Sequence, residues 1–149
     1  MPNEDLLGIP FKFRGRDRRG VDCLGLVWLY LRSKGIDIPD TDGLPMERDL
    51  QPDYLERAAQ ALSRFCDNVP HPGSGDIVLM RLPGGYTHLG VMVDGENMLH
   101  VLKDKPSGLE LLLKYRRRVV AVFRPRQKVA GLPTPPSVRS TVRPFPPPL

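Results

Sequence analysis

The sequence predicts an α+β domain in which N-terminal helices pack on a five-stranded antiparallel sheet. Apolar residues recur at helical spacing in the first half of the chain, whereas the second half holds short apolar runs separated by turn residues. Helices followed by antiparallel strands are typical of the α+β class. With 149 residues, of which 40% are apolar and 26% charged, the chain can form one domain with a substantial core.

The first predicted helix spans about residues 23–34, and the rest of the chain is organised around it. Asp22 is a favoured N-cap residue, and Gly25 leaves room for another backbone or a substrate to approach closely. This helix is apolar on every face, so we expect it to be buried, and Gly35 ends it. Cys23 lies in its first turn, where the helix dipole favours the reactive thiolate.

A second helix is predicted from about Pro52, a residue suited to the first helical position. Its apolar stripe consists of Leu55, Ala58, Ala59, Leu62 and Phe65. We expect Cys66, at the end of this helix, to be a small buried hydrophobe. Two cysteines do not make a disulfide framework, although a single bridge between them is an open alternative.

Turn residues separate five predicted strands. They span residues 76–81, 88–93, 98–102, 109–113 and 119–123. Asp94 and Gly95 mark a hairpin turn, whose four-residue loop makes paired positions sum to about 191. His88 and His100 then lie on neighbouring strands without being direct partners. A bulge would flip one of them, so the pattern leaves open whether they share a face.

The C-terminal segment has a different composition from the rest of the chain. Residues 124–149 hold five basic side chains and no acidic one, which equals the whole net charge of +5. The segment is also rich in proline, so we expect a folded domain over 1–124 and a disordered, basic, proline-rich tail over 125–149. This tail is either a terminus without a role or a segment that docks to an acidic surface or a partner protein.

Several classes of protein are not favoured. No apolar run approaches the roughly 20 residues of a membrane span. Residues 1–5 are acidic and lack an apolar core, which predicts no secretory signal. One cysteine and two histidines could form part of a zinc site, but no CxxC or HxxxH spacing supports it. We therefore expect no metal or other cofactor and no nucleic-acid partner.

Three residues are candidates for chemistry, namely Cys23, His88 and His100. Cysteine attack on a carbonyl requires a thiolate, an imidazole that takes and returns its proton, and a third polar group that fixes the tautomer of the imidazole. Backbone N–H groups at the start of the first helix are suited to stabilise an oxyanion. Each residue also has a structural alternative, because Cys23 and His100 could be core residues and His88 could cap a strand.

The stretch from Gly20 to Val27, GVDCLGLV, resembles the nucleophile motif of the NlpC family of papain-like cell-wall cysteine peptidases. Further segments resemble the family in the same order and spacing: residues 7–11 with Gly15, residues 75–78, residues 88–91 and residues 97–100. The resemblance extends from about residue 5 to residue 124. It implies a papain-like NlpC fold.

The resemblance also implies a function. Cys23 would be the nucleophile of a cysteine peptidase, His88 the general base and then acid, and His100 the residue that orients His88. The implied reaction is hydrolysis of peptide bonds in the stem peptides of bacterial peptidoglycan.

Three positions near the nucleophile are implied to bind the substrate. Many relatives have tyrosine where Phe11 stands and serine where Leu24 stands. In some relatives that serine helps to bind the amino end of the stem peptide, and here Asp22 is the polar residue that could do so.

The short chain and its DCLGL motif also resemble the bacteriophage tail-associated members of the family. A virion delivers such proteins to the cell wall, so they need no secretory signal. We therefore expect this protein in a phage tail, or made in the host cytoplasm without a signal peptide, and expect phage tail proteins as partners of residues 125–149. The alternatives are a structural tail-assembly protein with little catalysis and an amidase or acyltransferase with the same triad.

Overall fold

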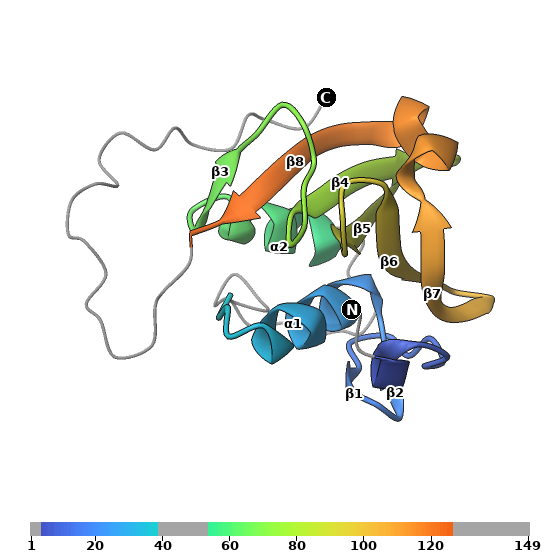
Figure 1. Ribbon diagram of the computed structural model, residues 1–149. Helices are drawn as coiled ribbons and strands as arrows, with labels where there is room; N and C mark the ends of the chain where they lie inside the picture. The colour runs from blue at the N-terminus through green and yellow to red at the C-terminus, as the bar shows by residue number, and fades with distance from the viewer. Residues whose placement is uncertain (1–3, 39–53, 127–149) are drawn as a thin grey trace.

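The computed structural model describes residues 4–38 and 54–126 (Figure 1). The first half of the chain forms the 3₁₀ turn η1 (Glu4–Leu6), the strands β1 (Arg16–Asp17) and β2 (Gly20–Val21), and the helices α1 (Cys23–Ser33) and α2 (Tyr54–Leu62). The second half forms β3 (Cys66–Asn68), β4 (Ile77–Leu82), β5 (Tyr86–Met92), β6 (Asn97–Leu102), β7 (Lys105–Leu111), the 3₁₀ helix η2 (Leu112–Arg118) and β8 (Val119–Pro125).

A six-stranded antiparallel sheet forms the body of the protein, with strand order β3-β8-β4-β5-β6-β7. Side chains of α1 and α2 join those of the sheet in one core, so both helices cover the same face. The predicted α+β fold is therefore confirmed, whereas the predicted count of five sheet strands is wrong. Outside this sheet, β1 and β2 form a separate hairpin.

The missed strand is β3, which pairs Cys66 with Pro125 at the end of β8. Two of its three residues are exposed and polar, so its own sequence carries no strand pattern, and its partner specifies it. Cys66 is buried, as predicted, but it begins this strand instead of ending the second helix. Both cysteines are free thiols.

The second helix is shorter than predicted. It ends at Leu62, and Phe65, which was expected in the buried stripe, is 46% exposed. The other four residues of the stripe do pack against the core. The predicted start near Pro52 lies outside the described residues. β7 begins at Lys105, earlier than predicted, because Pro106 and Gly108 mask its strand pattern.

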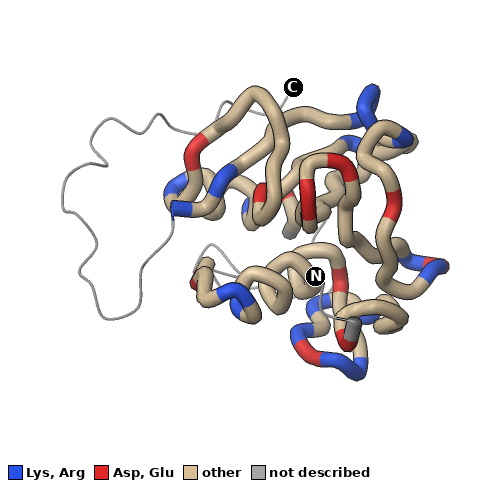
Figure 2. The backbone as a smooth tube through the Cα atoms, viewed as in Figure 1, with Lys and Arg blue, Asp and Glu red and all other residues tan. Residues whose placement is uncertain are grey.

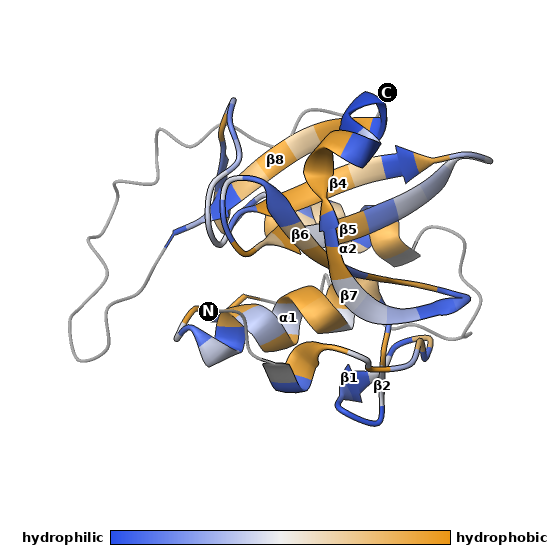
Figure 3. Ribbon diagram, turned by 45° about the vertical axis from the view of Figure 1, so that its right-hand side comes forward, coloured by the Kyte–Doolittle hydropathy of each residue, from blue (hydrophilic) through white to orange (hydrophobic). Residues whose placement is uncertain are grey.

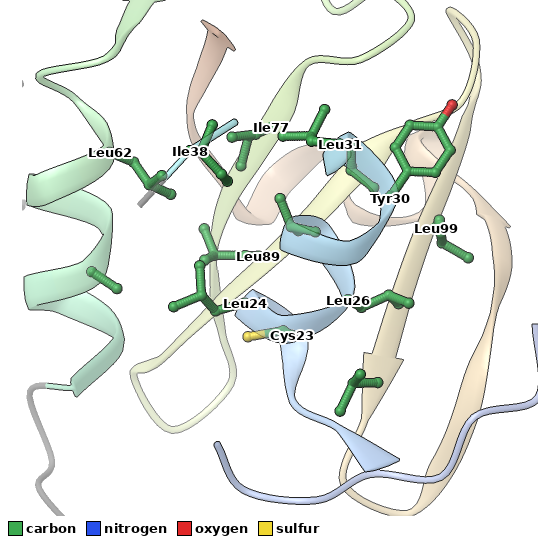
Figure 4. Packing of buried hydrophobic residues seen from close by; sticks show 14 of the residues in the cluster. Cys23, Leu24, Leu26, Tyr30, Leu31, Ile38, Leu62, Ile77, Leu89 and Leu99 are labelled. Carbon is green, nitrogen blue, oxygen red and sulfur yellow. The ribbon is translucent and has the colours of Figure 1, made fainter. Parts of the chain in front are cut away.

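The two faces of the sheet carry different clusters. Leu89 and Leu99 belong to the main core, which packs against α1 (Figure 4). Met80, Met92 and Met98 belong to a smaller cluster, which also includes residues of η2. Cross-strand partners share a face, so the pairing of His88 with Met80 places His88 on the face of the smaller cluster.

Helix α1 is buried as predicted, and hydrophobic residues line most of its length (Figure 3). Leu24, Leu26 and Leu31 are fully buried, and each such side chain contributes about 1.5–3 kcal/mol of hydrophobic stabilisation. A Cβ on Gly25 would lie 2.0 Å from the carbonyl oxygen of Gly15, which confirms that another backbone approaches there.

Lys and Arg residues gather in the β1–β2 hairpin and in η2 (Figure 2). In the hairpin they are paired: Arg16 with Asp22, Arg19 with Asp17, and Arg18 with Asp5. Three arginines of the β1–β2 hairpin are therefore matched by nearby carboxylates.

The folded body extends past the predicted boundary between residues 124 and 125. Pro125 is the last residue of β8, and Arg126 donates to the carbonyl oxygen of Arg64 at 2.8 Å. The rest of the predicted tail, residues 127–149, lies outside the described residues. Within residues 4–38 and 54–126, no helix has the length and apolar character needed to cross a membrane.

Candidate active site

Asp22 caps the N-terminus of α1, as predicted. Its Oδ1 accepts hydrogen bonds from the Gly25 N–H at 2.8 Å and from Arg16 Nη1 at 3.0 Å, and its Oδ2 accepts from the Arg14 N–H at 2.9 Å. The residue is only 2% exposed. The carboxylate thus ties the β1–β2 hairpin to the start of the helix, and a substrate ammonium would have to compete with Arg16 for it.

Cys23 is the first residue of α1 and is 4% exposed. Burial, with a smaller contribution from the Asp22 carboxylate, raises the pKa of its thiol to about 12. Backbone N–H groups of Leu89 and Leu24 and the charge of Arg16 lower the pKa, but by less. The helix dipole was expected to favour the thiolate. That expectation is wrong for this buried state, because the cost of desolvating an anion exceeds the stabilisation that the helix start provides.

A split in the sheet lies beside the thiol. β5 and β6 pair only at Val91↔Leu99 and Met92↔Met98, so the two strands part toward the start of β5. Helix α1 packs against both strands, and at its first residue the Cys23 thiol accepts a hydrogen bond from the Leu89 N–H of β5. Cys23 and Leu89 are both seen in Figure 4. The thiol therefore contacts β5 at the residue next to His88.

The register of the β5–β6 hairpin differs by one residue from the prediction. The observed pairs join residues of equal parity, so His88 and His100 lie on the same face of the sheet. This answers the question that the sequence left open. The two residues are diagonal neighbours across the strands, and not direct partners, as predicted.

His88 and His100 form a buried hydrogen-bonded pair. His88 Nε2 lies 2.9 Å from His100 Nδ1, and the rings meet edge to face with centroids 5.1 Å apart. Burial, with a smaller contribution from His100, lowers the pKa of His88 to about 3. Burial also lowers the pKa of His100, although Glu110 opposes that shift. Both rings are therefore neutral at pH 7.

Glu110 was not predicted to be part of the site. Its Oε1 lies 2.7 Å from His100 Nε2 and accepts from the Tyr115 hydroxyl at 2.7 Å, while Lys114 Nζ donates to Oε2 at 2.6 Å. Burial raises the pKa of Glu110, but the hydrogen bonds outweigh it and bring the pKa to about 2. The only sequence signal was that Glu110 falls in the strand predicted after the one carrying His100.

The structure joins some of the predicted site residues and not others. It joins His88 to His100 and places Cys23 against the neighbouring Leu89. Among the described residues, no hydrogen bond joins the Cys23 thiol to either histidine. The roles of these three residues stay predictions.

The remaining predicted substrate contacts lie close to Cys23. Phe11 is half-buried and bridges to Val21 just before α1. Leu24 is fully buried in the core, so a substrate could contact only its backbone. In residues 4–38 and 54–126, no group of three or more His, Cys, Asp or Glu side chains is arranged to hold a metal ion.

Solved structures with the same fold come from several organisms. An NlpC/P60 family protein from Bacillus cereus is 21% identical, with a TM-score of 0.59 over 80% of this chain and 36% of that one. A lipoprotein-like NLP/P60 protein from Staphylococcus aureus is 19% identical, with a TM-score of 0.59 over 83% of this chain and 38% of that one. The NlpC/p60 domain of the peptidoglycan hydrolase SagA is 19% identical, with a TM-score of 0.52 over 80% of this chain and 89% of that domain.

The chain thus spans little more than a third of the B. cereus and S. aureus proteins. No curated protein gives a significant match. The similarity to solved structures confirms the papain-like NlpC fold that the sequence predicted. The sequence model of the NlpC/P60 family matches residues 8–116, well over half of the chain, and the protein therefore belongs to this family of cell-wall cysteine peptidases.

Proposed function

We propose that this protein is a cysteine endopeptidase that hydrolyses peptide bonds in the stem peptides of bacterial peptidoglycan. The observation that carries the proposal is the buried hydrogen bond between His88 and His100, on the strand whose next residue contacts the Cys23 thiol. The family supports the same reaction class. SagA, whose domain shares the fold, is a peptidoglycan hydrolase.

The proposed reaction proceeds through a thioester. The Cys23 sulfur bonds to the substrate carbonyl carbon as its proton passes to His88, and N–H groups at the start of α1 stabilise the oxyanion. The C–N bond then breaks, and the leaving amine takes the proton from His88. Water, deprotonated by His88, attacks the thioester, and the acid product leaves as the thiol regains its proton.

The resting site holds a neutral thiol and neutral imidazoles, because burial raises the pKa of Cys23 and lowers that of His88. Proton transfer in that state is uphill and must accompany formation of the carbon–sulfur bond. The thiol must also turn from the Leu89 N–H toward His88. In the structure no hydrogen bond joins the thiol to His88, so the proposal requires that substrate binding bring the two groups together.

The two free cysteines provide a matched test. Cys23→Ala is expected to abolish the release of soluble fragments from purified peptidoglycan, whereas Cys66→Ala, on the edge strand β3, is expected to retain it. Mass spectrometry of the fragments identifies the broken bond and separates hydrolysis from acyl transfer, which joins an amine in place of water. Release by Cys23→Ala at the parent rate would overturn the proposal.

A structural role with little catalysis is the second candidate. The buried thiol, its raised pKa and the missing thiol–imidazole hydrogen bond favour it. This candidate predicts that the unsubstituted protein releases no fragments from peptidoglycan. Circular dichroism spectra identical to those of Cys23→Ala would show that both proteins are folded alike. Release that depends on Cys23 would exclude it.

We also propose that the protein is carried in a phage tail and acts on the cell wall from there, with residues 127–149 of the predicted tail as the docking segment. The DCLGL motif and the excess of basic side chains in this segment support the proposal. Deletion of 127–149 is expected to remove the protein from purified virions while fragment release persists. Undiminished incorporation into virions would contradict docking through this segment.

A further inference from the structure

Glu110 ends a chain of hydrogen bonds that begins at His88. His88 Nε2 and His100 Nδ1 are 2.9 Å apart, and His100 Nε2 and Glu110 Oε1 are 2.7 Å apart. The chain crosses three neighbouring strands, from β5 through β6 to β7. It lies in a protected environment, because both imidazoles are buried and the Glu110 side chain is 16% exposed.

The partners of Glu110 determine its protonation state. Lys114 Nζ donates to Oε2, the Tyr115 hydroxyl donates to Oε1, and Lys105 Nζ lies 3.8 Å from Oε2. These donors keep the group ionised, and an ionised carboxylate can only accept hydrogen bonds. His100 Nε2 must therefore carry a proton and donate it to Glu110.

The direction of the remaining bond follows from this one. A neutral imidazole has one N–H, so a proton on His100 Nε2 leaves His100 Nδ1 as an acceptor. His88 Nε2 faces that acceptor and must donate to it. Since His88 is also neutral, its Nδ1 has no proton.

We infer that Glu110 is a positioning residue that fixes the proton of His88 on Nε2 and leaves Nδ1 as the base for Cys23. The inference rests on the proposed function for the identity of the proton donor, whereas the proton positions follow from the hydrogen bonds together with the ionised Glu110 and the neutral imidazoles. When His88 takes the thiol proton, the same chain places the Glu110 carboxylate where it stabilises the new imidazolium.

Glu110→Gln separates this role from simple packing. Lys114 attracts the amide oxygen, which turns the NH₂ group toward His100 Nε2. His100 Nε2 must then accept, its Nδ1 must donate, and the proton of His88 moves to Nδ1. The variant therefore carries the wrong tautomer, and kcat for fragment release should fall by about 10²-fold or more with little change in KM.

Ring ¹⁵N NMR of the histidines measures the tautomers directly. The parent should show a protonated Nε2 and a bare Nδ1 on His88, and Glu110→Gln should show the reverse. Glu96→Gln, the same substitution on the exposed turn between β5 and β6, is the matched control and should leave the spectrum and kcat unchanged.

A second substitution tests the cause of the reversal. In Glu110→Gln/Lys114→Met the amide is no longer turned by Lys114, so its oxygen can accept from His100 again. The original tautomer should return, and kcat should be at least about tenfold higher than in Glu110→Gln, although Lys114→Met removes a further interaction. A purely structural role of Glu110 predicts no such recovery.

The outcomes distinguish this inference from the proposed function. A protonated Nδ1 on His88 in the unsubstituted protein at neutral pH overturns the inference even if no variant folds. Unchanged tautomers and kcat in Glu110→Gln overturn it as well. Tautomers that reverse in a protein whose parent form cleaves nothing support the proton placement and overturn the proposed function.

Discussion

Arg124 on β8 donates two parallel hydrogen bonds, of 2.9 and 2.8 Å, to the fully buried carboxylate of Asp76, which lies just before β4. The Asp76 carboxylate also accepts from the Gly73 N–H at 2.7 Å. The side chain of Arg124 is 53% exposed, whereas that of Asp76 is fully enclosed. Loss of Arg124 would therefore leave a buried carboxylate without its cation, whereas loss of the Asp76 charge would leave a guanidinium that water can still reach.

Removal of Arg124 should cost more stability than removal of Asp76. Arg124→Met leaves an uncompensated buried charge and should lower the free energy of unfolding by about 3–5 kcal/mol. Asp76→Asn leaves a half-exposed guanidinium and an amide oxygen that still accepts from Gly73, and should cost about 1.5–3 kcal/mol. Urea unfolding measures both values. The opposite order would contradict this account of the ion pair.

Gly25→Ala should disrupt the start of α1. The new Cβ would fall 2.0 Å from the carbonyl oxygen of Gly15, a backbone atom that cannot move alone. We expect a loss of about 2–3 kcal/mol in unfolding free energy, and fragment release should fall because Cys23 moves with the helix. Gly95→Ala is the control, since its Cβ would meet no atom within 4 Å. Equal stability of the two variants would argue against a close approach at Gly25.

The stability of the protein should fall as the pH drops from 6.5 toward 3. Burial holds the folded-state pKa of His88 at about 3, below the ordinary value of 6.5, so the unfolded chain binds more protons in this window. At pH 5 this single group costs about 2 kcal/mol relative to pH 7, and His100 acts in the same direction.

The histidine variants test this pH dependence. Urea unfolding of His88→Asn at pH 7 and pH 5 should show a smaller difference than the parent does. His71→Asn, which replaces an exposed histidine, should keep the parental difference. A parental difference in His88→Asn would show that His88 is not the buried neutral group responsible.

Alkylation of the native protein by iodoacetamide should be slow at pH 7 for both cysteines. Burial raises the pKa of each thiol to about 12, and the thiolate is the form that reacts. Labelling should become fast in urea, where the ordinary thiol pKa of about 8.5 applies. Peptide mapping by mass spectrometry assigns the label. Rapid labelling of native Cys23 at pH 6 would show that the thiol is ionised in the folded protein and would contradict its raised pKa.

The local features around Cys23 could be predicted because neighbouring residues carry the signals. The Asp22 carboxylate suits a helix cap, and the lack of a side chain at Gly25 permits a close backbone contact. Both residues act as expected. The thiolate was wrongly expected, since the degree of burial of Cys23 depends on how the whole helix docks onto the sheet.

Features set by distant partners could not be predicted in this way. β3 is a strand because β8 pairs with it, and its own three residues give no pattern. Glu110 reaches His100 because β7 and β6 pair in a particular register, with a shift after His100. The sequence pattern placed this strand only at residues 109–113, after Pro106 and Gly108, and so did not fix that register. Phe65 was misplaced because a helical period does not show where the helix ends.

The split between β5 and β6 leaves a part of the sheet that relies on helix α1 for cover. Where the two strands part, each has a backbone edge in the middle of the sheet, and unpaired strand edges are templates for association with other chains. Helix α1 packs against both strands, and the Cys23 thiol accepts a hydrogen bond from the Leu89 N–H. A fragment lacking residues 1–38 would therefore expose these two strand edges inside the sheet, and we expect it to aggregate more readily than the full chain.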